Sequence, residues 1–124
     1  MHVEIKNNFC IQFTHGSLTL SMGVGPSHYC DNHNTDLMSH VNYTKDHGEE
    51  TVGWIKKLPG PTEKAEFAII RHGQKELCAI GHDTVAGYIP LSKLGSALQI
   101  MQIEGMSDED KIEMLGHLFT KGLD

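Results

Sequence analysis

The sequence predicts an α+β protein, in which an antiparallel β-sheet of about five strands carries two C-terminal helices packed on one face. Alternating apolar runs open the chain, short strand-like runs fill its middle, and two stretches with helical periodicity close it. These elements do not repeat as strand–helix–strand units, so a doubly wound parallel sheet is not expected. At 124 residues, a single domain over 1–124 is expected.

The start of the chain predicts an N-terminal β-hairpin. Apolar and polar residues alternate over 9–13 and again over 18–22, on either side of a break at 14–16 that contains glycine. Alternation with a period of two around such a turn is typical of a hairpin. Residues 3–5 extend the first strand or form a separate short strand.

The stretch over residues 25–50 is polar and rich in Pro, Asn, Asp and Gly, which indicates a loop. Residues 34–36 are expected to cap a short helix that runs through 37–41. A loop of this length without structure of its own is unusual in a compact domain. Part of it is therefore expected to be ordered and to carry function.

The middle of the chain predicts short strands at 51–55, 65–71, 76–80 and 84–89, with a clear break at 58–61. The last three strands follow one another through tight links. They are therefore expected to form a central antiparallel meander.

The end of the chain predicts two helices. Pro90 suits a first helical turn, leucines recur at helical spacing over 91–101, and Gly105 ends the run. Ser107 is a good N-cap for the last helix, whose first turn holds acidic residues at 108–110. This acidic start is also a candidate docking surface.

Composition excludes several classes of function. The net charge is −6 and Arg71 is the only arginine, so direct nucleic-acid binding is not expected. No run of apolar residues is long enough to span a membrane, and the N-terminus lacks the features of a secretory signal. A cytoplasmic location is expected. Three widely spaced cysteines favour reduced thiols.

The densest chemistry lies in residues 23–33, where two glycines, a thiol, two imidazoles and a carboxylate follow a predicted strand. Tyr29 and Trp54 offer rings on which a nucleobase could stack, and Arg71 could meet a phosphate. No complete catalytic constellation is present, and no cofactor is expected. The predicted binding residues are His28, Tyr29, Cys30, Asp31, Asn32, His33, Trp54 and Arg71.

Two catalytic interpretations stay open. His28, Cys30 and His33 are residue types that bind zinc, although their spacing matches no familiar finger pattern. Cys30 could also act as a nucleophile if one of these imidazoles served as its base.

Residues 18–32 read LTLSMGVGPSHYCDN, and residues 83–90 read DTVAGYIP. The first segment resembles small phage and prophage proteins, in which a strand runs into a Gly-x-Gly turn and then a Tyr-Cys-Asp/Glu-Asn stretch. The second resembles their later part. Together the two segments cover about a quarter of the chain. The resemblance brings no catalytic residues with it.

Small acidic phage proteins without enzyme motifs often act by binding, and this analogy gives the leading expectation. It is a non-enzymatic inhibitor of a host defence system that binds a protein effector, in the cytoplasm of the host cell. One alternative is a sponge that sequesters a nucleotide second messenger. Another is a metal-dependent enzyme that uses His28, Cys30 and His33. Exposed strand edges make a homodimer a further expectation.

Overall fold

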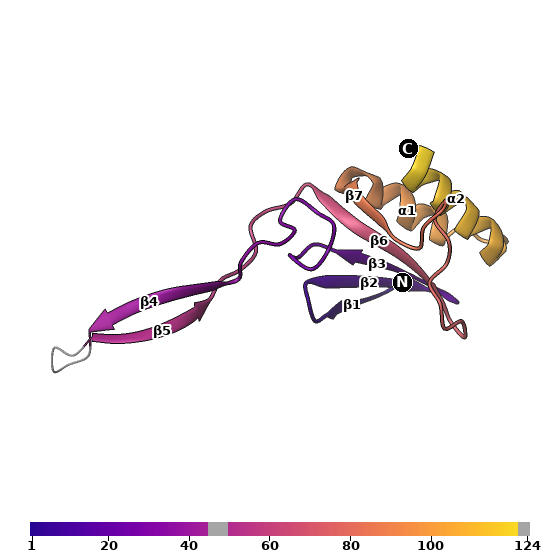
Figure 1. The fold of residues 1–124 in the computed structure, drawn as a ribbon. Helices are drawn as coiled ribbons and strands as arrows, with labels where there is room; N and C mark the ends of the chain where they lie inside the picture. Colours follow the sequence, from indigo (N-terminus) through magenta and orange to yellow (C-terminus); the bar gives the residue numbers. More distant parts are fainter. Residues whose placement is uncertain (45–49, 122–124) are drawn as a thin grey trace.

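The computed structural model describes residues 1–44 and 50–121, with side chains for 1–38 and 57–120. The strands in order are β1 (His2–Lys6), β2 (Cys10–His15), β3 (Leu18–Gly23), β4 (Met38–Thr44), β5 (Glu50–Lys56), β6 (Lys64–Arg71) and β7 (Ala86–Pro90). A 3-10 turn, η1 (Leu91–Lys93), then leads into helices α1 (Leu94–Met101) and α2 (Asp108–Lys121) (Figure 1).

The main sheet has five strands in the order β1-β2-β3-β6-β7, and every neighbouring pair is antiparallel. Strands β4 and β5 form a separate two-stranded sheet that the chain inserts between β3 and β6. The predicted α+β class, with a five-stranded antiparallel sheet and two C-terminal helices, is confirmed. We call β4 and β5 the arm, because they extend away from the main sheet (Figure 1).

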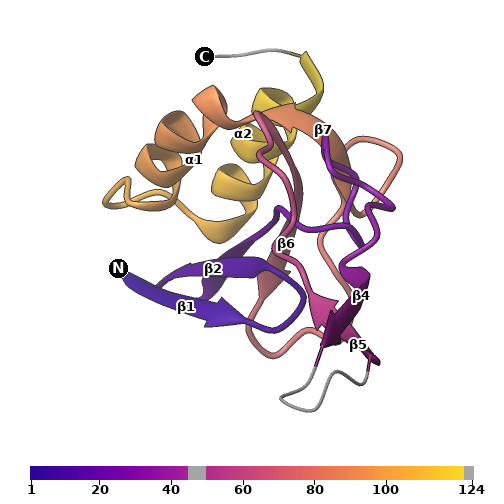
Figure 2. The same cartoon turned by 90° about the vertical axis from the view of Figure 1, so that its left-hand side faces the viewer.

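The core lies between one face of the main sheet and the two helices (Figure 2). In the β3–β6 register, Leu20 lies opposite Ile69 and Met22 lies opposite Phe67, so their side chains share this face. The ring of Phe67 stacks on that of Phe119 in α2, with centroids 4.7 Å apart. Burying each such side chain stabilises the fold by about 1.5–3 kcal/mol. The helices also contribute Ala97, Met101, Leu115 and Leu118 to the core.

Two lysines, one in α2 and one in η1, donate to carbonyl groups at the C-terminal ends of the two helices. The buried Lys111 of α2 donates from Nζ to the Met101 carbonyl at the end of α1, over 2.7 Å. Lys93 donates in turn to the Leu118 carbonyl in the last turns of α2, over 2.9 Å. Cations at helix C-termini are favourable because the helix dipole is negative there. Ser107 caps α2 with its hydroxyl, as its sequence position predicted.

The helix predicted through residues 37–41 is wrong, because Met38–Thr44 is strand β4. The polar residues before it do cap a backbone amide: Asp36 Oδ1 accepts from the Met38 N–H over 2.9 Å. This amide begins a strand rather than a helix. The alternating sequence of β4 finds a complete partner in β5, whose predicted core at 51–55 is confirmed.

The strand predicted at residues 76–80 is also wrong. Its part of the chain is tied to β6 by the Cys78 N–H, which donates to the Ile69 carbonyl, and it contains a single bridge from Ile80 to Asp83. Gln74 Nε2 donates to the Glu76 carbonyl over 3.0 Å, so this carbonyl is bonded within a local turn and not to a neighbouring strand. Strand β7, predicted at 84–89, occupies the place beside β6 instead.

Candidate functional site

The site lies at the end of the main sheet from which the arm leaves (Figure 1). Strand β3 ends there and strand β6 begins there, with Gly23 opposite Glu66. Two segments connect this end of the sheet to the arm, and we call them the neck: residues 24–37 and 57–63. Of the segment with the densest chemistry, 23–33, all residues after Gly23 therefore lie in the neck.

Asn32 joins the two segments of the neck. Its side chain is 5% exposed, and Nδ2 donates both to the Val24 carbonyl, over 3.0 Å, and to the Gly60 carbonyl, over 2.8 Å. Its Oδ1 lies 3.1 Å from the thiol of Cys30, which donates to it. Every hydrogen-bonding atom of the amide side chain is thus used inside the protein. Asn32 is a structural residue of the neck.

Asp31 makes a second connection between the same two segments. Its backbone N–H donates to Thr62 Oγ1 over 3.1 Å, and its Oδ2 accepts from the Glu63 N–H over 2.8 Å. A carboxylate that accepts a backbone N–H forms one of the stronger kinds of hydrogen bond. Asp31 and Asn32 together hold the neck in one conformation at the base of the arm.

His28 and Glu66 tie the neck to the main sheet. His28 Nε2 lies 2.9 Å from the Asn8 carbonyl, and because a carbonyl only accepts, Nε2 is the donor. Nδ1 lies 3.4 Å from Glu66 Oε1. Glu66 Oε2 also accepts from the Tyr29 N–H over 3.0 Å. Glu66 therefore positions both His28 and Tyr29.

The Gly-x-Gly pattern at 23–25 is explained by close packing rather than by phosphate binding. A Cβ on Gly23 would lie 2.3 Å from the His28 ring, and one on Gly25 would lie 2.7 Å from the Phe9 side chain. Contacts this short do not occur, so any larger residue would displace these rings. The two glycines let the neck fold back against the sheet.

Backbone strain is concentrated around the same segment. The non-glycine residues with positive φ in the described ranges are Asn8 (64°), Phe9 (57°), Asn34 (61°) and Tyr88 (55°). Each of them hydrogen-bonds to a residue between 24 and 29: Asn8 and Phe9 through their carbonyls, Asn34 and Tyr88 through their N–H groups. Such conformations cost of order 1–3 kcal/mol each and cluster at functional sites. This clustering marks the neck as the candidate site.

An exposed group of rings lies on the β7 side of the neck. The centroid of the Tyr29 ring is 5.0 Å from that of His33 and 6.2 Å from that of Tyr88. Tyr29 is 49% exposed and Tyr88 is 48% exposed. We call Tyr29, His33 and Tyr88 the aromatic site.

A β-bulge places Tyr88 in this group. Ala65 pairs with Ile89 while Phe67 pairs with Ala86, so β7 has one extra residue between these pairs. The bulge falls at Gly87 and Tyr88, and the Tyr88 N–H donates to the Tyr29 carbonyl over 2.8 Å. A bulge re-aims the side chain it carries. Here a strained tyrosine is directed beside a second tyrosine from the neck.

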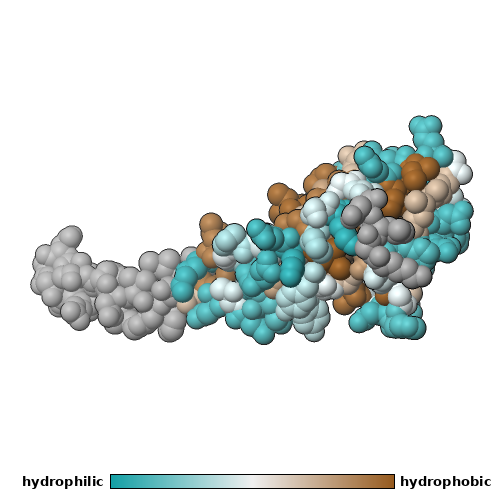
Figure 3. Space-filling view, turned by 90° about the horizontal axis from the view of Figure 1, so that it is seen from above, coloured by the Kyte–Doolittle hydropathy of each residue, from teal (hydrophilic) through white to brown (hydrophobic). Residues whose placement is uncertain are grey.

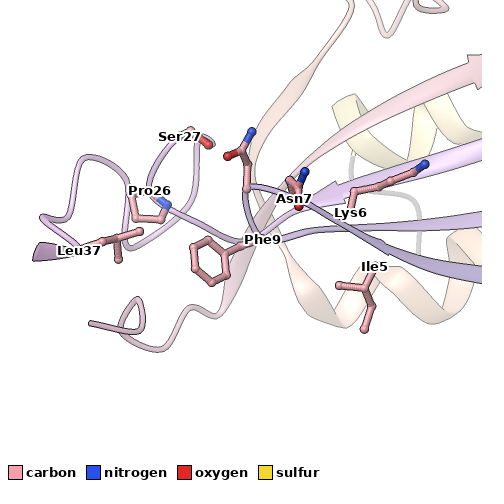
Figure 4. Close-up of a pocket in the computed structure, with 8 residues that line it drawn as sticks. Ile5, Lys6, Asn7, Phe9, Pro26, Ser27 and Leu37 are labelled. Carbon is pink, nitrogen blue, oxygen red and sulfur yellow. The ribbon is translucent and has the colours of Figure 1, made fainter. Parts of the chain in front are cut away.

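A cleft of about 480 Å³ lies on the β1 side of the neck. It is lined by residues 5–9 together with Pro26, Ser27 and Leu37. Figure 4 shows the Phe9 ring between Ile5 on one side and Pro26 and Leu37 on the other. The neck thus presents a concave surface on this side in addition to the aromatic site.

The residues predicted as metal ligands or nucleophile are engaged in internal contacts. Cys30 is 1% exposed, and its thiol lies 3.3 Å from the Gly25 carbonyl and 3.1 Å from Asn32 Oδ1. His33 Nδ1 donates to the His28 carbonyl over 2.8 Å. Across the residues that the structure describes, no three His, Cys, Asp or Glu groups gather as a metal site would require.

Arg71 lies at the opposite end of β6 from Glu66, five residues or roughly 16 Å along the strand. Its Nη2 donates to Glu109 Oε1 over 2.7 Å, and its Nε lies 3.7 Å from Asp108 Oδ2. The hydrogen bond that Arg71 donates to Glu109 raises the pKa of Arg71 above its ordinary value. Arg71 and the tyrosines are therefore not brought together as one nucleotide pocket.

Arg71→Gln is expected to weaken the dependence of stability on acid pH. The backbone N–H of Glu109 itself, and then Arg71, hold the pKa of Glu109 below its ordinary 4.5. A lowered carboxyl pKa stabilises the fold above pH 4.5, and this contribution is lost as the pH falls through the lowered pKa. Urea unfolding of wild type and variant between pH 3 and 7 checks this, with convergence expected at the acid end. Curves that stay parallel across this range would contradict it.

Trp54 lies in β5 opposite His40 of β4, and its side chain falls outside the described ones. The predicted stacking role of Trp54 therefore stays a prediction. Its backbone places it on the arm, beyond the neck.

Comparison with known proteins gives no relatives. No protein-family model matches the chain, and neither a curated protein nor a solved structure shows significant similarity to it. Among the helices within the described ranges, none combines the length and apolar character needed to cross a membrane.

Two residues of the site come from elements that sequence reasoning did not connect to the neck. Glu66 alternates with the buried Ala65 and Phe67 of β6, so its side chain lies on the other face of the sheet, and nothing in the sequence connects it to the neck. Tyr88 follows a glycine inside a short strand, which is the pattern of a bulge. That pattern is present in the sequence, but it does not name the partner of Tyr88.

Proposed function

We propose that this protein is a non-enzymatic binding protein that inhibits a host defence component, by docking on a protein effector through the aromatic site. The carrying observation is that two half-exposed tyrosines are held together by strained and hydrogen-bonded backbone. Exposing aromatic surface on a rigid frame lowers the entropy cost of binding. The proposed place of action is the cytoplasm of the host cell.

The chemistry of the aromatic site suits a protein partner. Tyrosine is enriched at protein interfaces because it offers a large apolar ring and a polar hydroxyl with few rotatable bonds. The face seen in Figure 3 shows apolar residues interspersed with polar ones over the main body. Such a mixed surface is typical of partners that associate and separate, rather than of obligate complexes.

The arm supports the same proposal. It is a two-stranded sheet that leaves the body at the end where the aromatic site lies (Figure 1). An isolated two-stranded sheet is only marginally stable in water. A partner that contacts both the aromatic site and the arm would stabilise the arm as it binds.

The segments that resemble phage proteins meet at this site. Tyr29 belongs to the first segment, at 18–32, and Tyr88 belongs to the second, at 83–90. Their backbones are joined by the hydrogen bond from the Tyr88 N–H to the Tyr29 carbonyl. The meeting of the two segments supports a shared binding role for them.

The test is affinity capture from bacterial extract with the full chain immobilised. Wild type is compared with the double variant Tyr29→Ala/Tyr88→Ala and with Met114→Ala, which removes an exposed apolar side chain on α2. The proposal predicts a protein that is retained by wild type and Met114→Ala and lost by the double variant. Equal retention by all three chains would contradict docking at the aromatic site.

A parallel melting experiment separates this proposal from its two alternatives. Cyclic nucleotides and ADP-ribose derivatives are added to wild type, and a rise in melting temperature with one of them would favour the nucleotide sponge. Zinc that is bound stoichiometrically, and whose removal lowers the melting temperature, would favour the metal-dependent enzyme. The proposed function predicts neither effect.

A further inference from the structure

Strand β1 is an unprotected edge of the main sheet. In the described part of the chain it pairs with β2 alone, and all five of its residues are exposed. The β1–β2 register is regular from His2 to Lys6 without a bulge. A regular edge strand leaves a row of unpaired N–H and C=O groups that can pair with another strand.

The other edge of the sheet is protected by contrast. Strand β7 is interrupted by the bulge at Gly87 and Tyr88, and it ends at Pro90, which has no N–H. The Tyr88 N–H is already bonded to the Tyr29 carbonyl. Bulges, prolines and covering loops are the usual devices that keep edges from pairing. The chain has these devices at β7 and not at β1.

The exposed apolar residues of β1 lie on the face of the sheet that carries the helices. Val3 pairs with Phe13 and Ile5 pairs with Ile11, and both partners pack against the core. The helices do not cover β1 itself, so Val3 is 54% exposed and Ile5 is 81% exposed. An exposed apolar edge strand is an expected site of association.

We propose that two copies of this chain associate by antiparallel pairing of their β1 strands, centred on Ile5. A two-fold axis perpendicular to the sheet keeps both pairs of helices on the same face and extends the apolar surface across the junction. In this register Ile5 lies opposite Ile5 of the second copy. Glu4 of each copy lies opposite Lys6 of the other, which forms two pairs of opposite charge.

Charge selects this register over its neighbours. Centring on Glu4 would place the two Glu4 carboxylates opposite each other, which is unfavourable. Centring on Val3 would pair Glu4 with His2 and would leave Lys6 without a cross-strand partner. Only centring on Ile5 uses both charged residues of β1 in attractive pairs. This inference does not depend on the proposed function.

The test is a set of charge reversals followed by sedimentation velocity and native mass spectrometry. Wild type is expected to be a dimer at tens of micromolar, with twice the 13.7 kDa mass of one chain. Glu4→Lys or Lys6→Glu alone turns two attractive pairs into repulsive ones, so each is expected to raise the dissociation constant about tenfold or more. Lys75→Glu, a reversal at an exposed turn residue, is expected to leave the dimer unchanged.

Two further samples fix the register. The double variant Glu4→Lys/Lys6→Glu restores both attractive pairs and is expected to dimerise like wild type. An equimolar mixture of the two single variants, one of them labelled with ¹⁵N, is expected to form the mixed dimer, because every cross-strand pair is then Lys with Glu. A monomeric wild type, or a dimer that neither reversal weakens, would overturn the proposal. Failure of the mixture to dimerise would overturn the register.

Discussion

Replacing Asn32 with alanine is expected to lower the free energy of unfolding by about 2–3 kcal/mol, because it removes a buried amide side chain together with its hydrogen bonds to two backbone carbonyl groups. These are the carbonyls of Val24 and Gly60, which accept from Asn32 Nδ2 over 3.0 and 2.8 Å. They belong to different segments of the neck, so the substitution also separates those segments. Urea unfolding at pH 7, followed by circular dichroism, measures the change.

The control for this result is Thr35→Ala, which changes an exposed residue of the same segment of the neck. It is expected to change the free energy of unfolding by less than about 0.5 kcal/mol. If Asn32→Ala were as mild as Thr35→Ala, the role of Asn32 in joining the neck would be wrong. The neck would then need another explanation for its conformation.

The second large effect is expected at Tyr88, where binding and stability should change in opposite directions. Tyr88→Gly removes an exposed ring of the aromatic site, and the loss of such an interface residue costs about 2 kcal/mol, or roughly thirtyfold in affinity. The same substitution relieves a φ of 55° in a β-strand. Because glycine adopts positive φ freely, the free energy of unfolding is expected to rise by up to about 1 kcal/mol.

Two variants test this opposition. Tyr88→Phe keeps the ring and is expected to keep most of the affinity for the captured protein, without a gain in stability. Tyr29→Ala removes the neighbouring ring and is expected to lower affinity, also without that gain, because Tyr29 is not among the residues with positive φ. A Tyr88→Gly protein that binds as tightly as wild type would show that Tyr88 does not contact the partner. Dissociation constants from titration calorimetry, with thermal melting, provide both readouts.

Much of the main body could be predicted because its elements are half buried and periodic. The alternation over 18–22 is clear since one face of β3 meets the helices and the other does not. The last helix was readable from Ser107 and its acidic first turn, which satisfy free N–H groups whatever the tertiary contacts. In these elements the local sequence signals and the pattern of burial predict the same secondary structure.

The arm and the residues after β6 could not be predicted in the same way. Asp36 caps a free N–H, and that signal is the same whether a helix or a strand follows. Residues 76–80 have the composition of a strand, but β7 occupies the position beside β6 that they would need. Tertiary packing decides which of two segments pairs with a given strand. A local sequence pattern does not contain that information.

The sequence singled out residues 28–33, but the roles of these residues could not be predicted from it. The density of functional groups at 28–33 reflects internal hydrogen bonds as much as exposed chemistry: Cys30 and Asn32 face inward, whereas Tyr29 is exposed. Tyr88 joins this group because of a β-bulge in β7, about sixty residues after Tyr29 in the sequence. The separation of Arg71 from this group depends on strand direction, which spacing does not reveal.

The measurement that tests the central claim most directly is hydrogen exchange of the full chain, with and without the captured protein. Docking at the aromatic site predicts slower exchange over residues 26–33 and 86–90 in the complex, with smaller changes in α1 and α2. Slower exchange confined to the start of α2, where Asp108 and Glu109 lie, would place the partner at the opposite end of β6. That result would contradict a binding role for Tyr29 and Tyr88.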